Sequence, residues 1–469
     1  MQIVSKPQTV GVAPLPHVVV VGAGFAGLTL TKALAHAPVR VTLIDKRNHH
    51  LFQPLLYQVA TSGLSPAQIA APIRSIVRDQ RNVTVLMGEV AGVDAVNREV
   101  TLEDRRIPFD YLVVATGARH SYFGHDDWEP YAPGLKSLED ATALRRRILL
   151  AFEQAESEPS KVEQARLLTF IVIGAGPTGV ELAGAIASIS RHVLPGEFRN
   201  FDPRSARILL VEAGPRVLSA FPEELSGEAK RRLEKLGVEV RLGQPVVACD
   251  ATGATIGGTR VPSQTIIWAA GVAASPAAQW LGAAADRAGR VIVRSDFAVP
   301  GHANIFVIGD TASATDATGK VLPGLAPVAK QQGSYVACVI EAKTLGKPAP
   351  AAFVYNNAGN LATIGRNAAV VDFGWLRLKG FVAWVLWSAV HIFFLIGFRN
   401  RLIVFFEWFW AYLTFQRSAR LITGAPAVAE SRGPRIEETR EPRTVDFGSK
   451  VSTSNAGAQA AAAAATRSH

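Results

Sequence analysis

The sequence predicts an α/β fold with two Rossmann-like units, followed by a pair of C-terminal amphipathic helices. Two glycine-rich segments, at residues 22–27 and 174–179, each follow a β-branched strand without a gap. A tryptophan-rich apolar run, at residues 381–415, carries the prediction of the C-terminal helices. Two such glycine-rich units form an internal repeat, which is far more specific than either unit alone.

The first unit opens on HVVVVGAGFAG, where four consecutive valines predict a buried parallel strand. Gly22 permits the tight turn, Gly24 lets a pyrophosphate approach the main chain, and Gly27 allows close packing of the following helix. The phosphates would lie at the helix N-terminus, where free N–H groups favour negative charge. The next strand ends on Asp45, which has the spacing of a carboxylate that binds a ribose hydroxyl. These features favour a dinucleotide site over a merely structural turn.

The second unit repeats this pattern in LLTFIVIGAGPTGVELAG, with Gly174, Gly176 and Gly179 after a strand. Its second strand ends on Glu212, and an insertion at residues 190–206 accounts for the long interval before it. Glu212 would accept a hydrogen bond from a ribose 2′-hydroxyl and repel a 2′-phosphate, so NADH is favoured over NADPH. We therefore expect one flavin dinucleotide and one nicotinamide dinucleotide.

Three further strands complete the two units. YLVVATGA and TIIWAAGVAASP each end in a small-residue turn, and Thr116 and Gly117 leave room for a ligand beside the main chain. NIFVIGDTAS ends on Gly309 and Asp310. A carboxylate at this end of a parallel strand lies where open α/β sheets bind ligands. A helix N-cap is the alternative role for Asp310.

The segment between Asp45 and residue 110 is less regular. Its aromatic and Gln-rich part, KRNHHLFQPLLYQVATSGLSP, fits a loop against a cofactor and an ordinary surface loop equally well. A helix is expected near Ala67 to Val77, and NVTVLMGEV and REVTLED alternate as strands. Farther along, LEDATALRRRILLAFEQAESE is expected to form a helix with a solvated charged face.

Composition restricts the classes of function. The 469 residues, 48% apolar and 19% charged, suffice for two or three domains with a large core. Cys249 and Cys338 form no CxxC pair, which argues against a disulfide framework, a local redox dithiol or a metal site. The net charge of +10 suits an anionic membrane or an acidic ligand, and nucleic acid is the weaker choice because no nucleic-acid-binding motif accompanies it. Residues 1–16 are expected to be flexible, and residues 424–469 disordered.

The C-terminal apolar run is expected to bind a membrane surface. Its segments, residues 381–398 and 402–415, are short against the roughly 20 apolar residues that span a bilayer. Basic residues at all ends fit helices lying in the headgroup layer better than a spanning hairpin. Buried core helices are the remaining alternative. His391 and Glu407 are expected on the polar face. The tryptophans expected to be exposed are Trp384, Trp387, Trp408 and Trp410.

Taken together, the glycine motifs, the ATG and GD turns and the order of segments resemble the two-dinucleotide flavoprotein reductases. DKRNHHLFQPLLYQVATSGLSP, GPTGVELAG and LAPVAKQQG narrow this resemblance to the type II NADH:quinone oxidoreductases, over about residues 17–423. These are single-chain NADH dehydrogenases of respiratory chains that pump no protons. The resemblance implies FAD in the first unit, NADH in the second, and a membrane quinone that meets the flavin from another side.

By motif, the resemblance also assigns residues to each ligand. The FAD residues would be Gly22, Ala23, Gly24, Phe25, Ala26, Gly27, Asp45, Lys46, Val90, Thr116, Gly117, Gly309, Asp310, Ala329 and Lys379. The NADH residues would be Gly174, Gly176, Thr178, Gly179, Glu212 and Gly271. The quinone residues would be Ala326, Lys330, Gln331 and Gln332. The family usually writes this last motif AQxxxQ, and this chain has Pro327 where the first Gln is expected.

Glu181 is the expected catalytic residue, close to the contact between nicotinamide and flavin. The alternative is a first-turn carboxylate that the helix dipole stabilises. The helix that starts near Ala326 would point its positive end toward the flavin.

The expected domains are an FAD-binding domain (residues 17–164 and 288–376), an inserted NADH-binding domain (165–287) and membrane-anchoring helices (377–423). The expected location is the cytoplasmic face of a bacterial inner membrane, as a peripheral protein, and a homodimer is left open.

Two other functions are considered. A sulfide:quinone oxidoreductase-like flavoprotein needs cysteines near the flavin, and the motifs around Cys249 and Cys338 do not resemble that pattern. A membrane-attached, NADH-sensing flavoprotein of the apoptosis-inducing-factor type would show negligible turnover.

Overall fold

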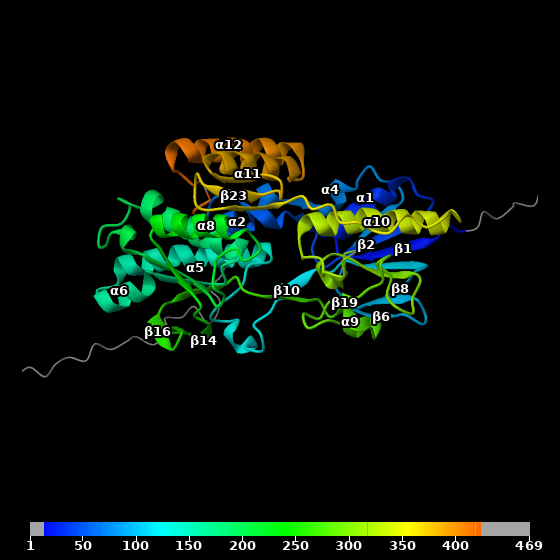
Figure 1. Cartoon of the computed structure of the whole chain (residues 1–469), viewed down its shortest axis with the longest axis horizontal. Helices are drawn as coiled ribbons and strands as arrows, with labels where there is room; N and C mark the ends of the chain where they lie inside the picture. Colours follow the sequence, from blue (N-terminus) through cyan, green and yellow to red (C-terminus); the bar gives the residue numbers. More distant parts are fainter. Residues whose placement is uncertain (1–13, 317, 418, 424–469) are drawn as a thin grey trace, which may run out of the picture. The chain divides into compact units, whose positions relative to one another are not determined.

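The valine run forms the centre of a five-stranded parallel sheet in the computed structural model, which describes residues 14–316, 318–417 and 419–423 (Figure 1). The strand order is β20 (Ile305–Val307), β9 (Tyr111–Val114), β1 (His17–Val21), β2 (Arg40–Asp45) and β5 (Val83–Met87). All of β1 is buried, as expected for a strand covered on both faces. Most of the expected flexible N-terminus and the whole of the expected disordered tail lie outside the described residues.

A second, four-stranded parallel sheet repeats this arrangement. Its order is β13 (Val238–Leu242), β12 (Arg207–Glu212), β11 (Thr169–Ile173) and β17 (Thr265–Trp268). The central strand of each sheet runs into a glycine turn and then a helix, α1 (Phe25–Ala33) after β1 and α7 (Pro177–Ser188) after β11. The predicted internal repeat is therefore present in the structure.

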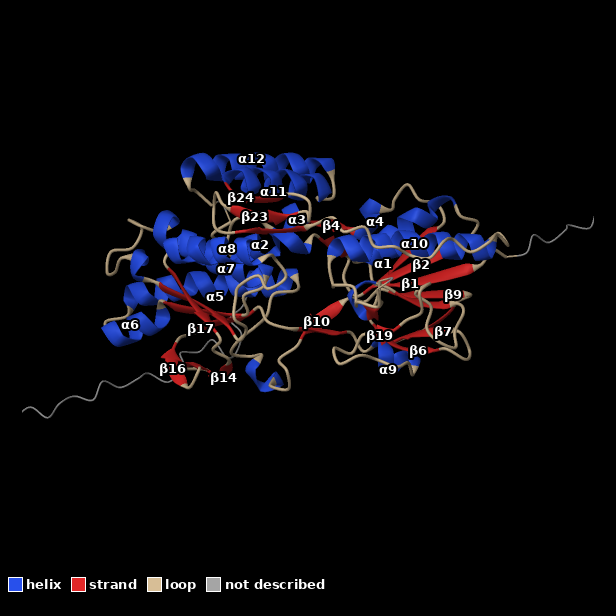
Figure 2. Ribbon diagram, in the orientation of Figure 1, coloured by secondary structure: helices blue, strands red, loops and turns tan. Residues whose placement is uncertain are grey.

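Two short strands, β10 (Ala118–His120) and β18 (Val272–Ala274), link the two sheets as an antiparallel pair (Figure 2). The predicted domain boundaries stay a prediction, and the packing bears on them at two places. The helix α5 (Leu138–Ser157) packs on β17 of the second sheet. The sheet of β22 (Asn360–Thr363), β23 (Ala369–Asp372) and β24 (Arg377–Gly380) packs on α7 and on α8 (Glu223–Lys235).

The remaining elements are small, apart from one long helix, α10 (Ala326–Thr344), which packs along α1. The small sheets are β6 (Val90–Asp94) with β7 (Glu99–Leu102) and β8 (Arg106–Pro108), β14 (Val246–Asp250) with β15 (Gly253–Ile256) and β16 (Thr259–Pro262), and β19 (Val291–Ile292) with β21 (Ala312–Ser313). Two short helices are α6 (Lys161–Leu167) and α9 (Ala277–Leu281).

The prediction of a helix near Ala67 to Val77 is wrong. The chain instead forms α3 (Pro66–Ile69), the strand β4 (Ala70–Pro72), which pairs with β3 (His49–Leu51), and α4 (Ile73–Ile76). Pro72 has no amide hydrogen and disfavours a helical conformation in the residue before it, so one continuous helix cannot pass this point.

The aromatic and Gln-rich segment before α3 is not an ordinary surface loop. It contains the short helix α2 (Leu56–Ala60), in which four of the five residues are buried. This helix packs against α5 and α7.

The C-terminal run forms two helices that lie side by side, α11 (Phe381–Phe394) and α12 (Phe398–Thr414) (Figure 1). Neither they nor any other helix in the described part of the chain is long and apolar enough to cross a membrane. The expectation of four exposed tryptophans is wrong except for Trp410, which is 56% exposed. Trp387 is only 2% exposed because it stacks on Trp408 and His391 and joins the main core.

Candidate functional site

The two glycine turns have nearly identical geometry. Gly22 and Gly174 adopt φ values of +101° and +99°. A Cβ atom at either position would lie within 3 Å of the main chain that follows the neighbouring strand. At Gly24 and Gly176, by contrast, a Cβ atom would meet nothing within 4 Å. Each turn therefore keeps an open space beside its second glycine, at a helix N-terminus, which fits a pyrophosphate group.

The third glycines hold the helices close to these turns. A Cβ atom at Gly27 would lie 1.9 Å from the carbonyl oxygen of Gly22, and one at Gly179 would lie 1.8 Å from that of Gly174. Any larger residue would therefore displace the helix from the turn.

The two strand-end carboxylates brace the same turns. Asp45 accepts hydrogen bonds from the amides of Ala23, at 2.7 Å, and Arg47, at 2.8 Å. Glu212 accepts from Ala175 at 2.7 Å and from the amide two residues after itself at 2.8 Å. A carboxylate can accept about four hydrogen bonds, so each retains capacity for a ribose hydroxyl.

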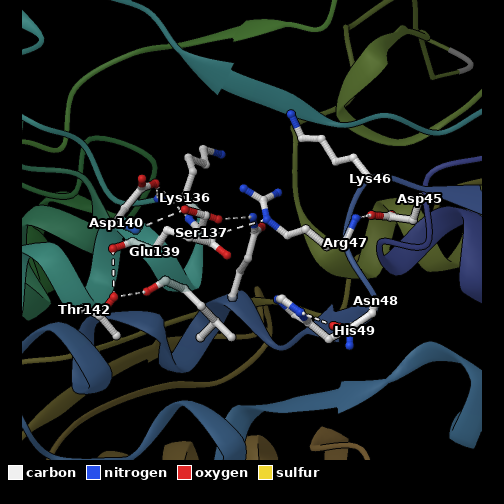
Figure 3. A network of polar contacts seen from close by, with 12 residues as sticks. Asp45, Lys46, Arg47, Asn48, His49, Lys136, Ser137, Glu139, Asp140 and Thr142 are labelled. Carbon is white, nitrogen blue, oxygen red and sulfur yellow. Dashed lines mark hydrogen bonds and ion pairs between the residues drawn. The ribbon is translucent and has the colours of Figure 1, made fainter. Parts of the chain in front are cut away.

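The chain after Asp45 is tied to the start of α5, as Figure 3 shows. The Arg47 guanidinium donates to Glu139 at 3.2 Å, and the Gln53 amide donates to the main-chain oxygen of Lys136 at 3.2 Å. Ser137 caps α5 through a reciprocal capping box. The edge of the first glycine turn is thus connected to a helix that packs on the second sheet.

A cavity of about 530 Å³, which we call the main cavity, brings six of the predicted site residues together. The first glycine turn contributes Phe25, and α7 contributes Thr178 and Glu181. The N-terminal turns of α10 contribute Ala326, Lys330 and Gln331, as well as Pro327. Residues predicted for three different ligands therefore share one cavity, and the N-terminus of α10 opens onto it.

Glu181 is buried beside this cavity, with 8% exposure. Burial raises the pKa of its carboxyl to about 8, so the group is mostly neutral at pH 7. The alternative of a first-turn carboxylate stabilised by the helix dipole is wrong, because α7 begins at Pro177 and carries no acidic residue in its first turn.

The predicted quinone residues divide between two environments. Lys330 lies over the Phe394 ring at 4.6 Å, and burial lowers the pKa of its ammonium. Gln331 lines the main cavity and exchanges two hydrogen bonds with the main chain of Asn356, at 2.8 and 2.9 Å. Gln332 is buried instead, and its side-chain oxygen accepts from the Gly309 amide at 2.6 Å, so it braces the end of β20.

The turn after β20 contains the predicted FAD residues Gly309, at φ +72°, and Asp310. The N-cap role for Asp310 is wrong, because it lies inside a short 3₁₀ turn whose N-cap is Ile308. Thr116 lies in the turn after β9, and its hydroxyl oxygen is 2.5 Å from the hydroxyl oxygen of Ser275.

Phe25 is the one predicted FAD residue in the described lining of the main cavity. The others lie outside this lining, and three of them have different surroundings. Lys46 pairs with Glu89 at 3.3 Å on the surface. Lys379, on β24, pairs with Glu224 of α8 at 2.8 Å. Val90 is buried at the start of β6.

His391 was predicted on a polar face, but it lines the main cavity instead, so the sequence did not identify it as a site residue. Its ring stacks on Trp387 at 4.1 Å, and its Nδ1 lies 2.7 Å from the Trp387 carbonyl oxygen. It lines the main cavity, and burial lowers its pKa to about 4. Glu407 is partly buried, at the edge of another pocket.

Phe52 and Tyr57, from the aromatic segment, also line the main cavity. The run of aromatic and Gln residues was the signal that could have identified them.

Comparison with known proteins agrees with this arrangement. Residues 16–333 match the pyridine nucleotide-disulphide oxidoreductase family, and residues 357–417 match the NDH2 C-terminal domain. The chain is 43% identical to the type II NADH:quinone oxidoreductase Ndh of Mycobacterium tuberculosis over 437 residues, which cover 90% of this chain and 93% of the relative. It is 44% identical to NdhA of the same organism over 424 residues, covering 87% and 89%.

Among solved structures, NDH2 of Plasmodium falciparum in complex with NADH superposes with a TM-score of 0.76. The match covers 87% of this chain and all of that one at 20% identity, so it supports the fold. Two glycine turns that could hold two dinucleotides, the shared cavity and the two close relatives lead to one conclusion. The chain belongs to the type II NADH:quinone oxidoreductase family.

Proposed function

We propose that this protein oxidises NADH by means of bound FAD and passes the electrons to a membrane quinone, without pumping protons. The main cavity is the observation that carries this proposal. It joins the helix of the second glycine turn to the first glycine turn and to the N-terminus of α10. The nicotinamide and the quinone must each reach the flavin for such a reaction, and a cavity lined by residues predicted for all three ligands fits that need.

In the first unit, Gly22, Gly24 and Gly27 would hold the FAD pyrophosphate, and Asp45 would hold its ribose. Bound FAD supplies a hydride acceptor and a two-electron donor. The N-terminus of α10 would stabilise negative charge on the ring system, since the free amides and the dipole point that way. The other FAD contacts proposed above complete this site, with Lys46, Val90 and Lys379 having the weakest structural support.

In the second unit, the glycine turn would hold the NADH pyrophosphate, and Glu212 would select its ribose. Gly271, at φ +72° after β17, would contact the nucleotide on the strength of the motif alone, since a Cβ atom there would lie 2.4 Å from the Phe123 ring. Thr178 and Glu181 would lie nearest the nicotinamide, because they are the α7 residues that, with Pro177, reach the main cavity. A neutral Glu181 can donate a hydrogen bond without adding charge to the site.

The outer side of α11 and α12 suits attachment to a lipid surface. Apolar side chains that are at least 43% exposed there include Val382, Val385, Phe398, Leu402, Phe405, Phe406, Phe409, Trp410 and Leu413. Exposed apolar patches of this kind mark interaction sites, and helices of this kind lie in the headgroup layer. We place the protein on the cytoplasmic face of a bacterial inner membrane. A homodimer is also compatible with this proposal.

The two rival functions have less support. Cys249 lies on β14 and Cys338 in the middle of α10, and neither belongs to the described lining of the main cavity, which disfavours sulfide chemistry. Steady-state NADH oxidation by the FAD-loaded full-length protein, with menadione as acceptor, tests the proposal against the sensing role. We expect multiple turnovers. Reduction of the flavin by NADH without turnover of menadione would contradict the proposal.

A further inference from the structure

A second cavity, of about 320 Å³, lies beneath the C-terminal helices. Aromatic side chains of α11 and α12 form much of its wall, including Trp384, Trp408 and Tyr412, and we call it the aromatic cavity. Two of its described lining residues, Tyr57 and Glu181, also line the main cavity, and no other described residue is shared. These two side chains therefore form the junction between the two cavities.

Tyr57 is held at this junction by a chain of hydrogen bonds from α12. The Trp408 indole donates to the Gln58 side-chain oxygen at 2.8 Å. The Gln58 amide in turn donates to the Tyr57 hydroxyl oxygen at 2.9 Å. Tyr57 is 6% exposed, and within the described ranges its hydroxyl makes no hydrogen bond beyond the one that it accepts from Gln58. A buried hydroxyl without an acceptor is costly, so its proton is available to a ligand.

We propose that the Tyr57 hydroxyl donates a hydrogen bond to a ring carbonyl oxygen of the bound quinone, and that Gln58 and Trp408 position it. This inference rests on the proposed function. An oxidised quinone has two carbonyl acceptors, no donor and an apolar ring. The junction offers the complement, a free donor between aromatic walls.

The charge states at the junction agree with this role. Burial keeps the pKa of Tyr57 well above its ordinary value, so the hydroxyl stays protonated at neutral pH. Glu181, with a pKa of about 8, adds little negative charge there. The carbonyl oxygen becomes more negative as the ring is reduced, which strengthens the hydrogen bond. An interaction that strengthens toward the transition state raises kcat more than it lowers KM.

The first test is Tyr57→Phe in the FAD-loaded full-length protein, with menadione as the quinone. Loss of the hydrogen bond should lower kcat/KM for menadione about tenfold, mainly through kcat. The rate of flavin reduction by NADH, measured by anaerobic stopped flow, should stay within about twofold of wild type. Tyr122→Phe is the matched control, because that buried hydroxyl donates to the Ala132 carbonyl at 3.0 Å in a different core cluster.

The second test is Trp408→Phe, which removes the indole N–H while keeping an aromatic ring. It should lower kcat/KM for menadione about two- to fivefold. In the Tyr57→Phe background, Trp408→Phe should cost nothing further, since it acts through the missing hydroxyl. If Tyr57 and Trp408 had independent structural roles, the two losses in kcat/KM would be additive in free energy. That result would overturn the proposal that Trp408 positions Tyr57.

A Tyr57→Phe variant with menadione kinetics within twofold of wild type would overturn the role of Tyr57. Failure of the proposed function is a separate result, since it would already appear in the wild-type protein as flavin reduction without quinone turnover.

Discussion

The two glycine turns are nearly superimposable in their dihedral angles, but the helices that follow them are covered by different structures. In the first unit α10 lies across α1, so closely that a Cβ atom at Gly333 would lie 2.4 Å from the Ala26 carbonyl oxygen. In the second unit the sheet of β22–β24 lies across α7, where a Cβ atom at Gly184 would lie 2.8 Å from the Gly365 amide. The glycine motif thus defines the conformation of each turn. The element packed on the following helix, α10 or the sheet of β22–β24, defines the surroundings of that helix.

The same difference appears at one matched helix position. Five residues after the second glycine, α1 carries Thr29 and α7 carries Glu181. Thr29 is partly buried, whereas Glu181 is buried with a pKa raised to about 8. The repeat therefore supplies two similar binding turns, and only the second helix adds a titratable group to the main cavity.

The largest effect is expected from filling the open space beside each second glycine. Gly24→Val should fold, because its side chain meets no protein atom near Cβ, but it should lose FAD because the side chain occupies the phosphate space. Gly176→Val should keep FAD and lose NADH binding, with at least about a hundredfold weaker affinity. Flavin absorbance and NADH titration measure these outcomes. Loss of FAD from Gly176→Val would contradict the assignment of the two turns.

A second large effect is expected at the outer surface of the hairpin of α11 and α12, in which α11 packs on the sheet of β22–β24 and α12 leaves apolar side chains exposed. Phe405→Glu with Phe409→Glu should abolish co-sedimentation with anionic vesicles, because each removes about 1.5–3 kcal/mol of apolar burial at most. Both side chains are at least 50% exposed, so the fold should survive. NADH oxidation with a soluble acceptor should be unchanged.

The control for this pair is Val354→Glu, which is 76% exposed but lies outside the hairpin. Vesicle binding by the double variant at the wild-type level would refute attachment through this surface. Deleting both helices is a poorer test, because it would remove Ala383, Trp387 and Val404, which belong to the main core, and would expose the core residues that they pack against.

The sequence predicted the features that depend on neighbouring residues. The buried valine strand and the glycine turns follow from local spacing and form as predicted. Asp45 and Glu212 end their strands as predicted, and their contact with ribose stays a prediction. The environments of two other residues depend on distant contacts. His391 was predicted on a polar face, but its ring stacks on Trp387. Gln332 is buried, and its side-chain oxygen accepts a hydrogen bond at the end of β20.

The main cavity belongs to the same class of long-range feature. Its walls come from the first glycine turn, α2, α7, α10 and α11, which are spread along the chain from Phe25 to Phe394. Periodicity identifies each helix but does not specify which face meets which partner. The helix expected at residues 67–77 does not form for a local reason, because Pro72 cannot continue a helix and disfavours a helical conformation in the residue before it.

A moderate effect is expected from Glu181→Gln on the pH dependence of stability. The folded pKa of about 8 exceeds the ordinary value of 4.5, so the folded state holds a proton that the unfolded state releases between these pH values. Wild-type stability should therefore fall relative to the variant as pH rises from about 5 to 8, by on the order of 1.4 kcal/mol per unit of pKa shift. Denaturant titrations of both proteins at several pH values measure this difference. Parallel curves would show that Glu181 titrates normally, and Thr29→Ser, at the matched position of α1, is the control.

The smallest effect is expected at the strand-end carboxylates, and it sharpens the comparison most. Glu212→Gln removes the charge that would repel a 2′-phosphate, so the preference for NADH over NADPH in kcat/KM should narrow about three- to tenfold. Its oxygens accept from two amides, and Gln retains only one acceptor, so activity with NADH should also fall. The ratio of kcat/KM for NADH to that for NADPH distinguishes the two effects, because losing the amide hydrogen bonds should lower both values equally, whereas losing the charge should change their ratio. Asp45→Asn makes the same change in the first unit, where it should weaken FAD retention but leave the ratio untouched. If Glu212→Gln lowers both activities equally, Glu212 braces the turn and does not select the nucleotide.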